Sequence, residues 1–237
     1  MQAIILAGGR GKRLKPFTTV LPKPLMPLGE VPILEVIIKQ LKRDGFCDLI
    51  IAVSYLKELI MAFVGNGERW NLNISYSTED KPLGTAGPLT LINSLEENFL
   101  VINGDTLTTI DYKKLFEFHL KNNACATIST FKRNIKIDFG IVKTDNKGFL
   151  SEYIEKPTYS FEVSMGVNVF NRKILNYIVK NEYIDMPQMI LRLKDNGEKV
   201  QRYLFDGYWL DIGRIDDYET ANLIFEEKKN VFLRGCL

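Results

Sequence analysis

The sequence predicts an α/β fold in which helices cover a mainly parallel β-sheet. Short apolar runs bounded by turn residues recur along the chain, and segments with helical periodicity fill the intervals between them. The chain has 237 residues, of which 46% are hydrophobic, so it can bury a substantial core. The apolar runs that we interpret as strands are residues 3–7, 49–53, 99–102 and 124–131.

Three helices are predicted from apolar residues that recur every three or four positions. The first opens at Pro32, which suits an initial helical turn, and ends before Gly45. The others cover residues 112–121 and 215–227. His119 lies in the second of these helices, where we expect it on the surface. Because it is the only histidine, the sequence excludes histidine-rich metal sites and most serine or cysteine catalytic triads.

A β-hairpin is predicted where the pattern changes near residue 132. Residues 140–143 and 149–154 are typical of two strands, and the turn residues Asp145, Asn146 and Gly148 lie between them. We expect this part to form a lid or wall over the edge of the sheet. The sequence contains no repeat and no flexible linker, which favours a single domain over residues 1–237.

The charge balance excludes several partners. Lysine and arginine number 31 against 29 aspartate and glutamate, and a net charge of +2 gives no general attraction to nucleic acid or to an anionic membrane.

The apolar run at the N-terminus is too short to span a bilayer. Cys47, Cys125 and Cys236 are far apart and odd in number, which favours reduced thiols in a cytoplasmic protein.

A glycine-rich loop, Gly8-Gly9-Arg10-Gly11-Lys12, follows the first predicted strand, at the edge where open α/β sheets bind ligands. Five cations precede the first acidic residue, Glu30, although the whole chain is nearly neutral; they are Arg10, Lys12, Arg13, Lys15 and Lys23. This concentration of positive charge and backbone N–H groups suits a polyphosphate with about three to four negative charges. For the loop alone, a solvated surface turn is an equally good interpretation.

Lys23 separates these two interpretations better than the loop does. It lies between Pro22 and Pro24, which restrict the backbone and hold the lysine in a defined direction. A solvated lysine has no need for this restriction. The glycine spacing matches neither the phosphate loop of kinases nor the dinucleotide fingerprint, so neither a kinase nor a dehydrogenase is predicted.

Asp105 is a candidate ligand for a magnesium ion. It follows the strand predicted at residues 99–102, which puts its carboxylate beside the glycine-rich loop. Mg²⁺ prefers a few carboxylate oxygens together with phosphate oxygens and waters. The alternative is a turn or helix-cap role for Asp105.

These segments resemble the signature of a known family. Leu6-Ala7-Gly8-Gly9-x-Gly11-x-Arg13-Leu14-x-Pro16-x-Thr18, followed by Pro22-Lys23-Pro24, is similar to the motif of the sugar-1-phosphate nucleotidyltransferases. The resemblance continues through nearly the whole chain. It implies a Rossmann-like sheet of the nucleotide-diphospho-sugar transferase type with a small β-rich sugar-binding insertion. It also implies Mg²⁺ as cofactor, and a nucleoside triphosphate and a sugar 1-phosphate as partners.

On this resemblance, residues 1–131 bind the nucleotide. The segment Leu83-Gly84-Thr85-Ala86-Gly87 is similar to the family's loop on the base side, and it most resembles the mannose-1-phosphate guanylyltransferases. This favours GTP, with UTP, dTTP and CTP as alternatives. Thr85 is also suited to cap a helix over residues 89–95. The implied nucleotide-binding residues are Leu6, Ala7, Gly8, Gly9, Gly11, Lys12, Arg13, Gly84, Thr85 and Ala86.

Four residues carry the catalytic roles that the resemblance implies. Asp105 and Asp211 bind Mg²⁺, the latter in a segment similar to the family's late Trp-x-Asp-x-Gly motif. Arg13 stabilises pyrophosphate, and Lys23 acts at the reacting phosphates. The attacking phosphate oxygen is already ionised near neutral pH, so the reaction needs no general base.

The resemblance assigns residues 132–213 to the sugar phosphate and residues 214–229 to a C-terminal helix. Glu155-Lys156-Pro157 is similar to a family motif in which the lysine contacts the sugar phosphate and the glutamate the sugar hydroxyls. Ser164 stands where the family often has asparagine, which leaves the sugar open. The implied sugar-phosphate-binding residues are Gly140, Glu155, Lys156, Gly166 and Asn168.

Two functions from other classes stay open. A glycosyltransferase that uses nucleotide-sugars has no need of a cationic loop for a triphosphate. A non-catalytic sensor of sugar nucleotides has no need to keep Arg13, Lys23, Asp105 and Asp211 together. A homo-oligomer is compatible with each of these functions.

Overall fold

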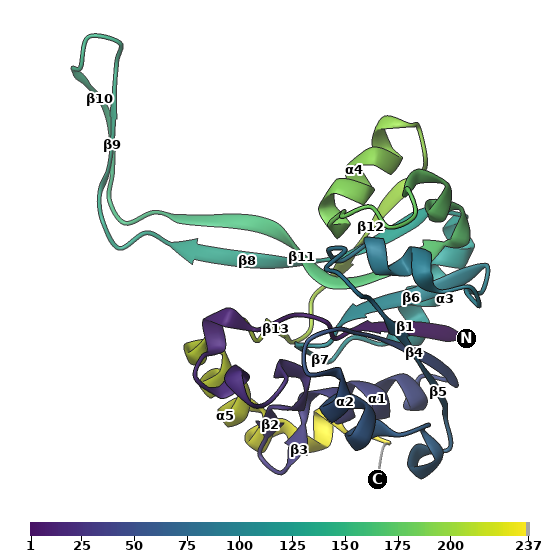
Figure 1. Ribbon diagram of the computed structural model, residues 1–237. Helices are drawn as coiled ribbons and strands as arrows, with labels where there is room; N and C mark the ends of the chain where they lie inside the picture. Colours follow the sequence, from purple (N-terminus) through teal and green to yellow (C-terminus); the bar gives the residue numbers. More distant parts are fainter. Residues whose placement is uncertain (236–237) are drawn as a thin grey trace.

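A seven-stranded mixed sheet forms the centre of the fold (Figure 1). β11 runs antiparallel to its neighbours β6 and β8, and the other pairings are parallel. From one edge to the other the strands are β12 (Val200–Phe205), β8 (Ala126–Lys136), β11 (Thr158–Asn171), β6 (Asn98–Asn103), β1 (Gln2–Leu6), β4 (Asp48–Val53) and β5 (Asn73–Thr78). This computed structural model describes residues 1–235, and Cys236 lies outside them. The predicted mainly parallel α/β fold is confirmed.

Helices and three small sheets complete the described chain. The α-helices are α1 (Ile33–Arg43), α2 (Lys57–Val64), α3 (Tyr112–Asn122), α4 (Met186–Asp195) and α5 (Ile215–Phe232). The 3₁₀ helices are η1 (Lys12–Leu14), η2 (Phe17–Thr19), η3 (Lys23–Leu25), η4 (Glu68–Trp70), η5 (Gly87–Leu91) and η6 (Arg172–Tyr177). The small sheets pair β2 (Pro27–Leu28) with β3 (Val31–Pro32), β7 (Thr106–Thr108) with β13 (Trp209–Asp211), and β9 (Ile141–Thr144) with β10 (Leu150–Ile154). The predicted helices correspond to α1, α3 and α5.

Alternate residues of the central strands enter two hydrophobic cores on opposite faces of the sheet. Ala3 and Ile5 of β1 belong to the core that contains α1, α3 and α5, whereas Ile4 belongs to the core that contains η5, η6 and α4. All three side chains are fully buried. Figure 1 shows the same division, with α1, α2 and α5 on one side of β1 and α4 on the other. A parallel sheet needs this cover on both faces because its central strands are apolar on both sides.

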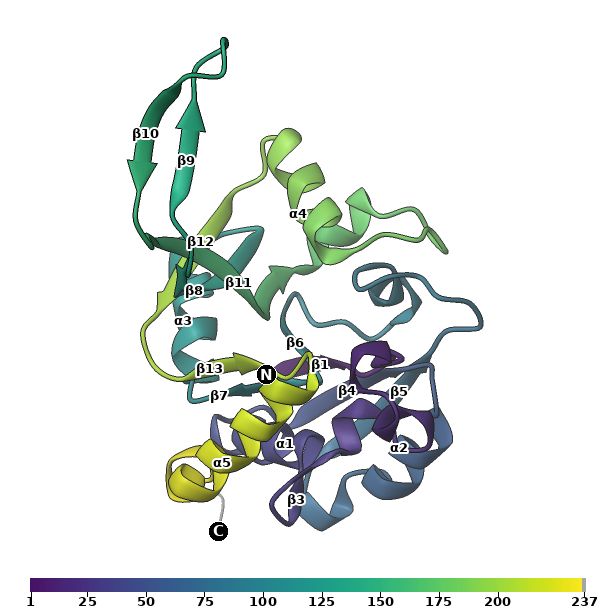
Figure 2. The same ribbon diagram turned by 90° about the vertical axis from the view of Figure 1, so that its left-hand side faces the viewer.

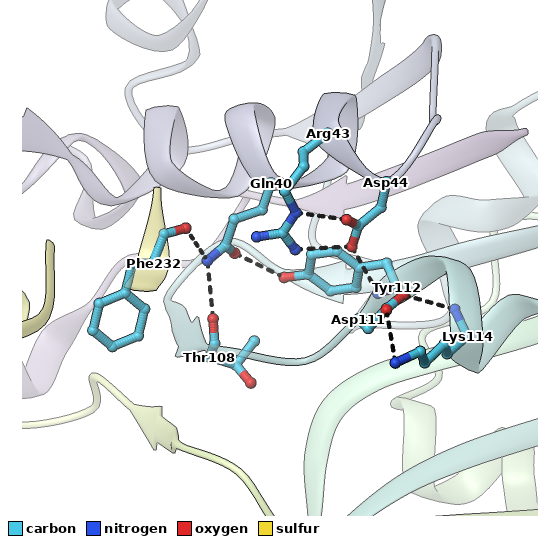
Figure 3. Close-up of polar contacts among 8 residues, drawn as sticks. All are labelled: Gln40, Arg43, Asp44, Thr108, Asp111, Tyr112, Lys114 and Phe232. Atoms are coloured by element: carbon cyan, nitrogen blue, oxygen red, sulfur yellow. Dashed lines mark hydrogen bonds and ion pairs between the residues drawn. The ribbon is translucent and has the colours of Figure 1, made fainter. Parts of the chain in front are cut away.

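A buried amide joins four segments beneath the sheet (Figure 3). Gln40 of α1 donates through Nε2 to the carbonyl oxygens of Thr108 (2.9 Å) and Phe232 (3.1 Å), and its Oε1 accepts from the Tyr112 hydroxyl at 3.3 Å. The Asp44 carboxylate accepts from the backbone N–H of Tyr112 at 2.9 Å. These contacts tie β7, α3 and the end of α5 to α1. They also fix the strand that follows Asp105.

The predicted hairpin exists but does not form the expected lid. The outer halves of β8 and β11 leave the sheet as a two-stranded ribbon, and β9 and β10 continue it after a sharp bend (Figures 1 and 2). We call residues 132–163 the arm. Both views show the arm standing away from the body. The expectation of a lid over the sheet edge is therefore wrong for the arrangement described here, because the β8–β11 ladder carries the hairpin outward.

The expected position of His119 is also wrong. Its side chain is 1% exposed, with Nδ1 at 2.9 Å from Thr127 Oγ1 and Nε2 at 3.1 Å from Asn98 Oδ1. Burial lowers the pKa of His119 from 6.5 to about 4. The helical periodicity led to a wrong prediction because α3 turns this polar side chain toward β8, where the Thr127 hydroxyl forms a hydrogen bond with it.

Two further features bear on the sequence predictions. None of the helices in residues 1–235 has the length and apolar character needed to cross a membrane. Cys47 is exposed and Cys125 is buried, and both are free thiols. Burial, followed by the nearby Glu198 carboxylate, raises the pKa of the Cys125 thiol to about 11, so this thiol is unreactive at neutral pH.

Replacing Gln40 with leucine is expected to destabilise the fold by about 2–5 kcal/mol, because two buried carbonyls and a buried hydroxyl lose their partner. Urea unfolding followed by circular dichroism measures the change. Lys42→Leu, on the exposed side of the same helix, is the matched control and should change the free energy of unfolding by less than about 0.5 kcal/mol. Equal stability of the Gln40→Leu protein and the wild type would contradict the role of this amide.

The buried His119 predicts a pH dependence of stability. Its pKa is 6.5 when unfolded and about 4 when folded, so below pH 6.5 the unfolded chain binds a proton that the folded chain does not. The free energy of unfolding should therefore fall as the pH drops from 6.5 toward 4, with a slope approaching about 1.4 kcal/mol per pH unit. Urea titrations at pH 5.5, 6.5 and 7.5 test this. The His119→Gln protein should lose most of the slope, and an unchanged slope would contradict the assignment.

Candidate functional site

A cleft of about 900 Å³ opens at the carboxyl ends of β1, β4, β5 and β6. Leu6 is level with Ala52 on one side and with Asn103 on the other, so the loops that follow these strands begin at the same height. Open α/β sheets bind ligands at this edge. The residues predicted to bind there that do line the cleft are Leu6, Ala7, Gly8, Gly9, Gly11, Lys12, Lys23, Gly84, Thr85 and Asp105.

The glycine-rich loop packs closely against its neighbours. A Cβ at Gly8 would lie 3.2 Å from Ser54 Cβ, and one at Gly11 would lie 2.8 Å from Thr18 Cγ2. Gly11 also has φ +58°, a conformation that favours glycine, and its carbonyl accepts from the Thr18 hydroxyl at 2.8 Å. The loop is therefore held in a defined shape, which a merely solvated turn would not require.

Lys23 and Asp105 form a partly buried ion pair at the floor of the cleft. Lys23 is 8% exposed, and its Nζ donates to Asp105 Oδ2. The lysine opens η3 after Pro22, whose extended backbone (φ −63°, ψ 139°) directs the chain inward. This confirms that the lysine between the two prolines has a defined direction. The other carboxylate oxygen of Asp105 is buried and has no partner among the described residues.

Asp211 and Arg13 reach the same place from distant parts of the chain. β13 pairs with β7 so that Asp211 is level with Thr106, and the N–H of Ile212 donates to the Asp105 carbonyl at 3.1 Å. A Cβ at Gly213 would lie 3.1 Å from Asp211 Oδ2 and 3.2 Å from Arg13 Nη2, so both side chains approach this glycine. The fold thus brings the four residues with implied catalytic roles together.

Burial and the neighbouring charged side chains change the pKa of the Asp211 carboxyl. Burial is the largest cause that raises the pKa of this carboxyl, and the Asp105 carboxylate raises it further. Lys23 and Arg13 act in the opposite direction. Two carboxylates in a partly buried place repel each other, so a cation between them is stabilising.

The carboxylates suit magnesium better than a metal that needs a full set of protein ligands. Within residues 1–235, no group of three or more His, Cys, Asp or Glu side chains is arranged to hold a metal ion. Mg²⁺ commonly takes one or two carboxylates and completes its octahedron with waters and phosphate oxygens. Asp105 and Asp211, with a free buried oxygen on Asp105, fit that pattern.

The loop of residues 83–87, which the resemblance assigns to the base side, is docked on the start of α4. Gly84 has φ +77°, and a Cβ there would lie 2.5 Å from the Ile184 carbonyl oxygen. The Thr85 hydroxyl accepts from the N–H of Met186 at 2.7 Å. Thr85 therefore does not cap residues 89–95 as expected; that segment begins as η5 after Ala86. Ala86 is fully buried and lies behind the cleft surface.

Several residues that line the cleft were missed by the sequence predictions. Ser54 and Tyr55 follow β4, a predicted strand, so the rule that places ligands at strand ends identifies their segment. Glu79 and Asp80 follow β5, which was not among the predicted strands. Asp185 is the N-cap of α4 and forms a capping box with Gln188, a local signal that locates this helix start. The missed lining residues include Ser54, Tyr55, Glu79, Asp80, Tyr183 and Asp185.

The implied sugar side is only partly brought together. Gly166 has φ +70°, and a Cβ there would lie 2.4 Å from Nδ2 of Asn103, a cleft residue. Asn168 is buried in β11, and its Oδ1 has no partner among the described residues. Gly140, Glu155 and Lys156 lie on the arm and are not among the residues that line the cleft. Lys156 Nζ is 3.9 Å from Glu155 Oε1, and both side chains are more than half exposed.

Comparisons with known proteins agree with the motifs. A family model described as nucleotidyl transferase matches residues 2–228. A D-glycero-alpha-D-manno-heptose 1-phosphate guanylyltransferase of Aneurinibacillus thermoaerophilus is 33% identical over 93% of this chain and 96% of its own length. A UTP–glucose-1-phosphate uridylyltransferase of Synechocystis is 31% identical over 99% of this chain, which spans 66% of that relative.

A solved structure supports the same relationship. HddC from Yersinia pseudotuberculosis superposes with a TM-score of 0.72 at 26% identity, covering 94% of this chain and 99% of that one. Its complex with GMP-PN superposes with a TM-score of 0.70 at 25% identity, with the same coverage. The fold, the ordered motifs and the match over residues 2–228 lead to one conclusion: the chain belongs to the nucleotidyl transferase family, as its resemblance to the sugar-1-phosphate nucleotidyltransferases predicted.

Proposed function

We propose that the protein transfers a nucleoside monophosphate from a nucleoside triphosphate to a sugar 1-phosphate and releases pyrophosphate. The convergence of Lys23, Asp105, Asp211 and Arg13 is the observation that carries this proposal, and the first two of these residues line the glycine-rich cleft. Relatives named as guanylyltransferase and uridylyltransferase of sugar 1-phosphates support it.

In this reaction an oxygen of the sugar 1-phosphate attacks the α-phosphorus of the triphosphate. The bond from that phosphorus to the oxygen bridging to the β-phosphate breaks, and pyrophosphate leaves with the electron pair. In the proposed reaction the glycine-rich loop presents backbone N–H groups to the phosphates, and Arg13 is assigned to neutralise the leaving pyrophosphate. Lys23 provides a fixed positive charge at the reacting phosphates. Positioning and charge neutralisation suffice, because the attacking oxygen needs no base.

We propose Mg²⁺ as the cofactor, held by Asp105 and Asp211. Bound there, it supplies Lewis acidity and neutralises charge on the α-phosphate. The Lys23 ammonium contacts Asp105 through Oδ2, and Oδ1 of the same carboxylate is buried and has no partner among the described residues.

We further propose GTP as the nucleotide and the cytoplasm as the compartment. The segment Leu83-Gly84-Thr85-Ala86-Gly87 resembles the base-side loop of guanylyltransferases. Two carboxylates support the choice: Asp185 accepts from the Thr85 N–H at 3.1 Å, and Asp80 lines the same cleft. Guanine, cytosine and adenine present an exocyclic amino donor that a carboxylate accepts well, whereas uracil and thymine have no such group, so this contact disfavours UTP and dTTP. The relative from Aneurinibacillus and the structure with GMP-PN agree with this choice.

The acceptor side is assigned to Glu155, Lys156, Gly166 and Asn168 in the same proposal, with Gly140 supporting the arm. Gly140 has no room for a Cβ, which would lie 2.3 Å from the Tyr153 hydroxyl oxygen. A nucleotide-sugar glycosyltransferase is disfavoured because the three cleft cations Arg10, Lys12 and Lys23 exceed what a nucleoside diphosphate needs.

Replacing Asp105 with asparagine is expected to reduce pyrophosphate release by about 100- to 1,000-fold, because the substitution removes a charge that acts directly at the reacting phosphates. A coupled pyrophosphate assay measures turnover, and thermal unfolding checks that the variant is folded. Asp195→Asn, at the exposed end of α4, is the matched control and should keep wild-type turnover. Near-normal turnover by a folded Asp105→Asn protein would sink the metal assignment.

The nucleotide is tested with a matrix of five nucleoside triphosphates against several sugar 1-phosphates, with Mg²⁺ or with EDTA. We expect kcat/KM to be at least about tenfold higher with GTP than with the other four, a difference of about 1.4 kcal/mol in transition-state binding. EDTA should abolish release. Preference for another triphosphate would overturn the GTP assignment alone, and no release from any pair would favour the sensor.

A further inference from the structure

The connection between η6 and α4 forms part of the cleft wall, although it belongs to the second half of the chain. Residues 178–185 contain no helix or strand, and Tyr183 and Asp185 line the cleft. Oδ1 of Asp185 accepts from the N–H of Thr85, in the loop assigned to the base. Because a segment without regular structure is held by few bonds of its own, it needs other contacts to keep these side chains in place.

Backbone contacts join this connection to the loop assigned to the base. The Ile184 N–H donates to the Leu83 carbonyl at 3.0 Å, and the Ile184 carbonyl accepts from the N–H of Ala86 at 3.0 Å. A Cβ at Gly87 would lie 2.6 Å from the Glu182 carbonyl oxygen, so the glycine permits this close approach. Figure 2 shows the connection between η6 and α4 beside the one between β5 and β6. The position of one segment therefore depends on that of the other.

Arg192 fixes the connection from the side of α4. Its Nη1 and Nη2 donate to the two carboxylate oxygens of Glu182 at 3.0 and 2.8 Å, and Nη1 also donates to the Tyr177 carbonyl at 2.7 Å. Oε2 of Glu182 accepts in addition from the N–H of Val179 at 3.0 Å. Because the ion pair is bidentate, it fixes the orientation of the carboxylate as well as its distance. One arginine thus ties the start of the connection to its middle.

The effect of this ion pair is mainly local. The side chains of Arg192 and Glu182 are 37% and 28% exposed, and water screens the attraction between partly exposed charges, so the pair adds little to global stability. The hydrogen bonds from Arg192 and from the Val179 N–H lower the pKa of the Glu182 carboxyl to about 2, so the pair is ionised at neutral pH. Tyr183 lies between two anchors, the Glu182 ion pair and the Ile184 side chain, which is buried in the core.

We propose that Arg192 is a positioning residue for the nucleotide. Through Glu182 it holds the connection against the loop assigned to the base, and so it sets the affinity for the nucleoside triphosphate. This inference rests on the proposed function. The groups that act on the phosphates there come from other segments, namely η1, η3, the connection between β6 and β7, and β13. The affinity should therefore depend on Arg192, whereas the rate of transfer in the bound complex should not.

Replacing Arg192 with methionine tests the inference by direct binding. Methionine fills similar space but has no donor, so the connection loses this anchor. Isothermal titration with GTP and Mg²⁺, without a sugar 1-phosphate, should give a Kd raised by about three- to tenfold. The KM for GTP should rise with it, while kcat stays within about twofold of the wild-type value. If the wild type binds another of the five triphosphates more tightly, that triphosphate is the probe.

Three further variants separate positioning from a general structural effect. Arg172→Met removes a comparable contact, from Nη1 to the Leu95 carbonyl at 3.1 Å, and should leave Kd and KM unchanged. Arg192→Lys keeps the charge without the bidentate contact and should give a Kd between those of the wild type and Arg192→Met. Glu182→Gln keeps the shape of the partner and removes its charge, so it should raise Kd by about two- to threefold even if Arg192→Met does not fold. Thermal unfolding checks that each variant is folded.

An unchanged Kd in folded Arg192→Met and Glu182→Gln proteins would overturn the inference. An equal rise in Kd for Arg172→Met, or a fall in kcat at constant KM for Arg192→Met, would overturn it too. Because binding is measured without an acceptor, it is independent of turnover. A wild type that binds the triphosphate but releases no pyrophosphate from any pair would contradict the proposed function alone, while the Kd values would still decide the role of Arg192. A wild type that binds none of the five triphosphates would contradict both.

Discussion

The register that joins β1 to β4 and β6 is the constraint on which the cleft depends. Leu6 is level with Ala52 and Asn103, and the pairing extends beyond the strands: Ala7 N–H donates to the Ala52 carbonyl at 2.8 Å and Gly104 N–H donates to the Leu6 carbonyl at 2.9 Å. A Cβ at Gly104 would lie 2.9 Å from that Leu6 oxygen, so the glycine permits this approach. The glycine-rich loop and the Asp105 loop therefore start side by side.

The charges near these loops are arranged for a ligand more than for stability. Burial and the nearby Asp105 carboxylate raise the pKa of Asp211, and Lys23 and Arg13 oppose them. A partly buried ion pair contributes little net stability, because desolvation offsets much of the attraction. The buried, unpartnered oxygen of Asp105 adds to the cost. In the proposed function, a metal ion and phosphates relieve this cost when they bind.

Local rules located part of the secondary structure, while β5, β11 and β12 of the central sheet and the helices α2 and α4 were not predicted. The four predicted strands overlap β1, β4, β6 and β8, and the three helices correspond to α1, α3 and α5. The sequence pattern gave wrong predictions for side chains whose position is set by contacts with distant parts of the chain. His119 has a polar side chain in an amphipathic helix, and only the neighbouring β8 supplies the hydroxyl of Thr127 that allows its burial. Thr85 has the properties of a helix cap, but it bonds to the start of α4.

The sequence by itself determined the glycine-rich loop, the restricted backbone around Lys23, the strand that ends before Asp105 and the family. Each of these depends on residues close together in the chain, so local conformational preference and charge are enough to predict them. Only the tertiary structure decided that Arg13 and Asp211 meet at Gly213 and that the arm carries Glu155 and Lys156 away from their own cleft. These outcomes depend on the pairing of β7 with β13 and of β8 with β11, whose partners are distant in sequence and whose registers no local pattern specifies.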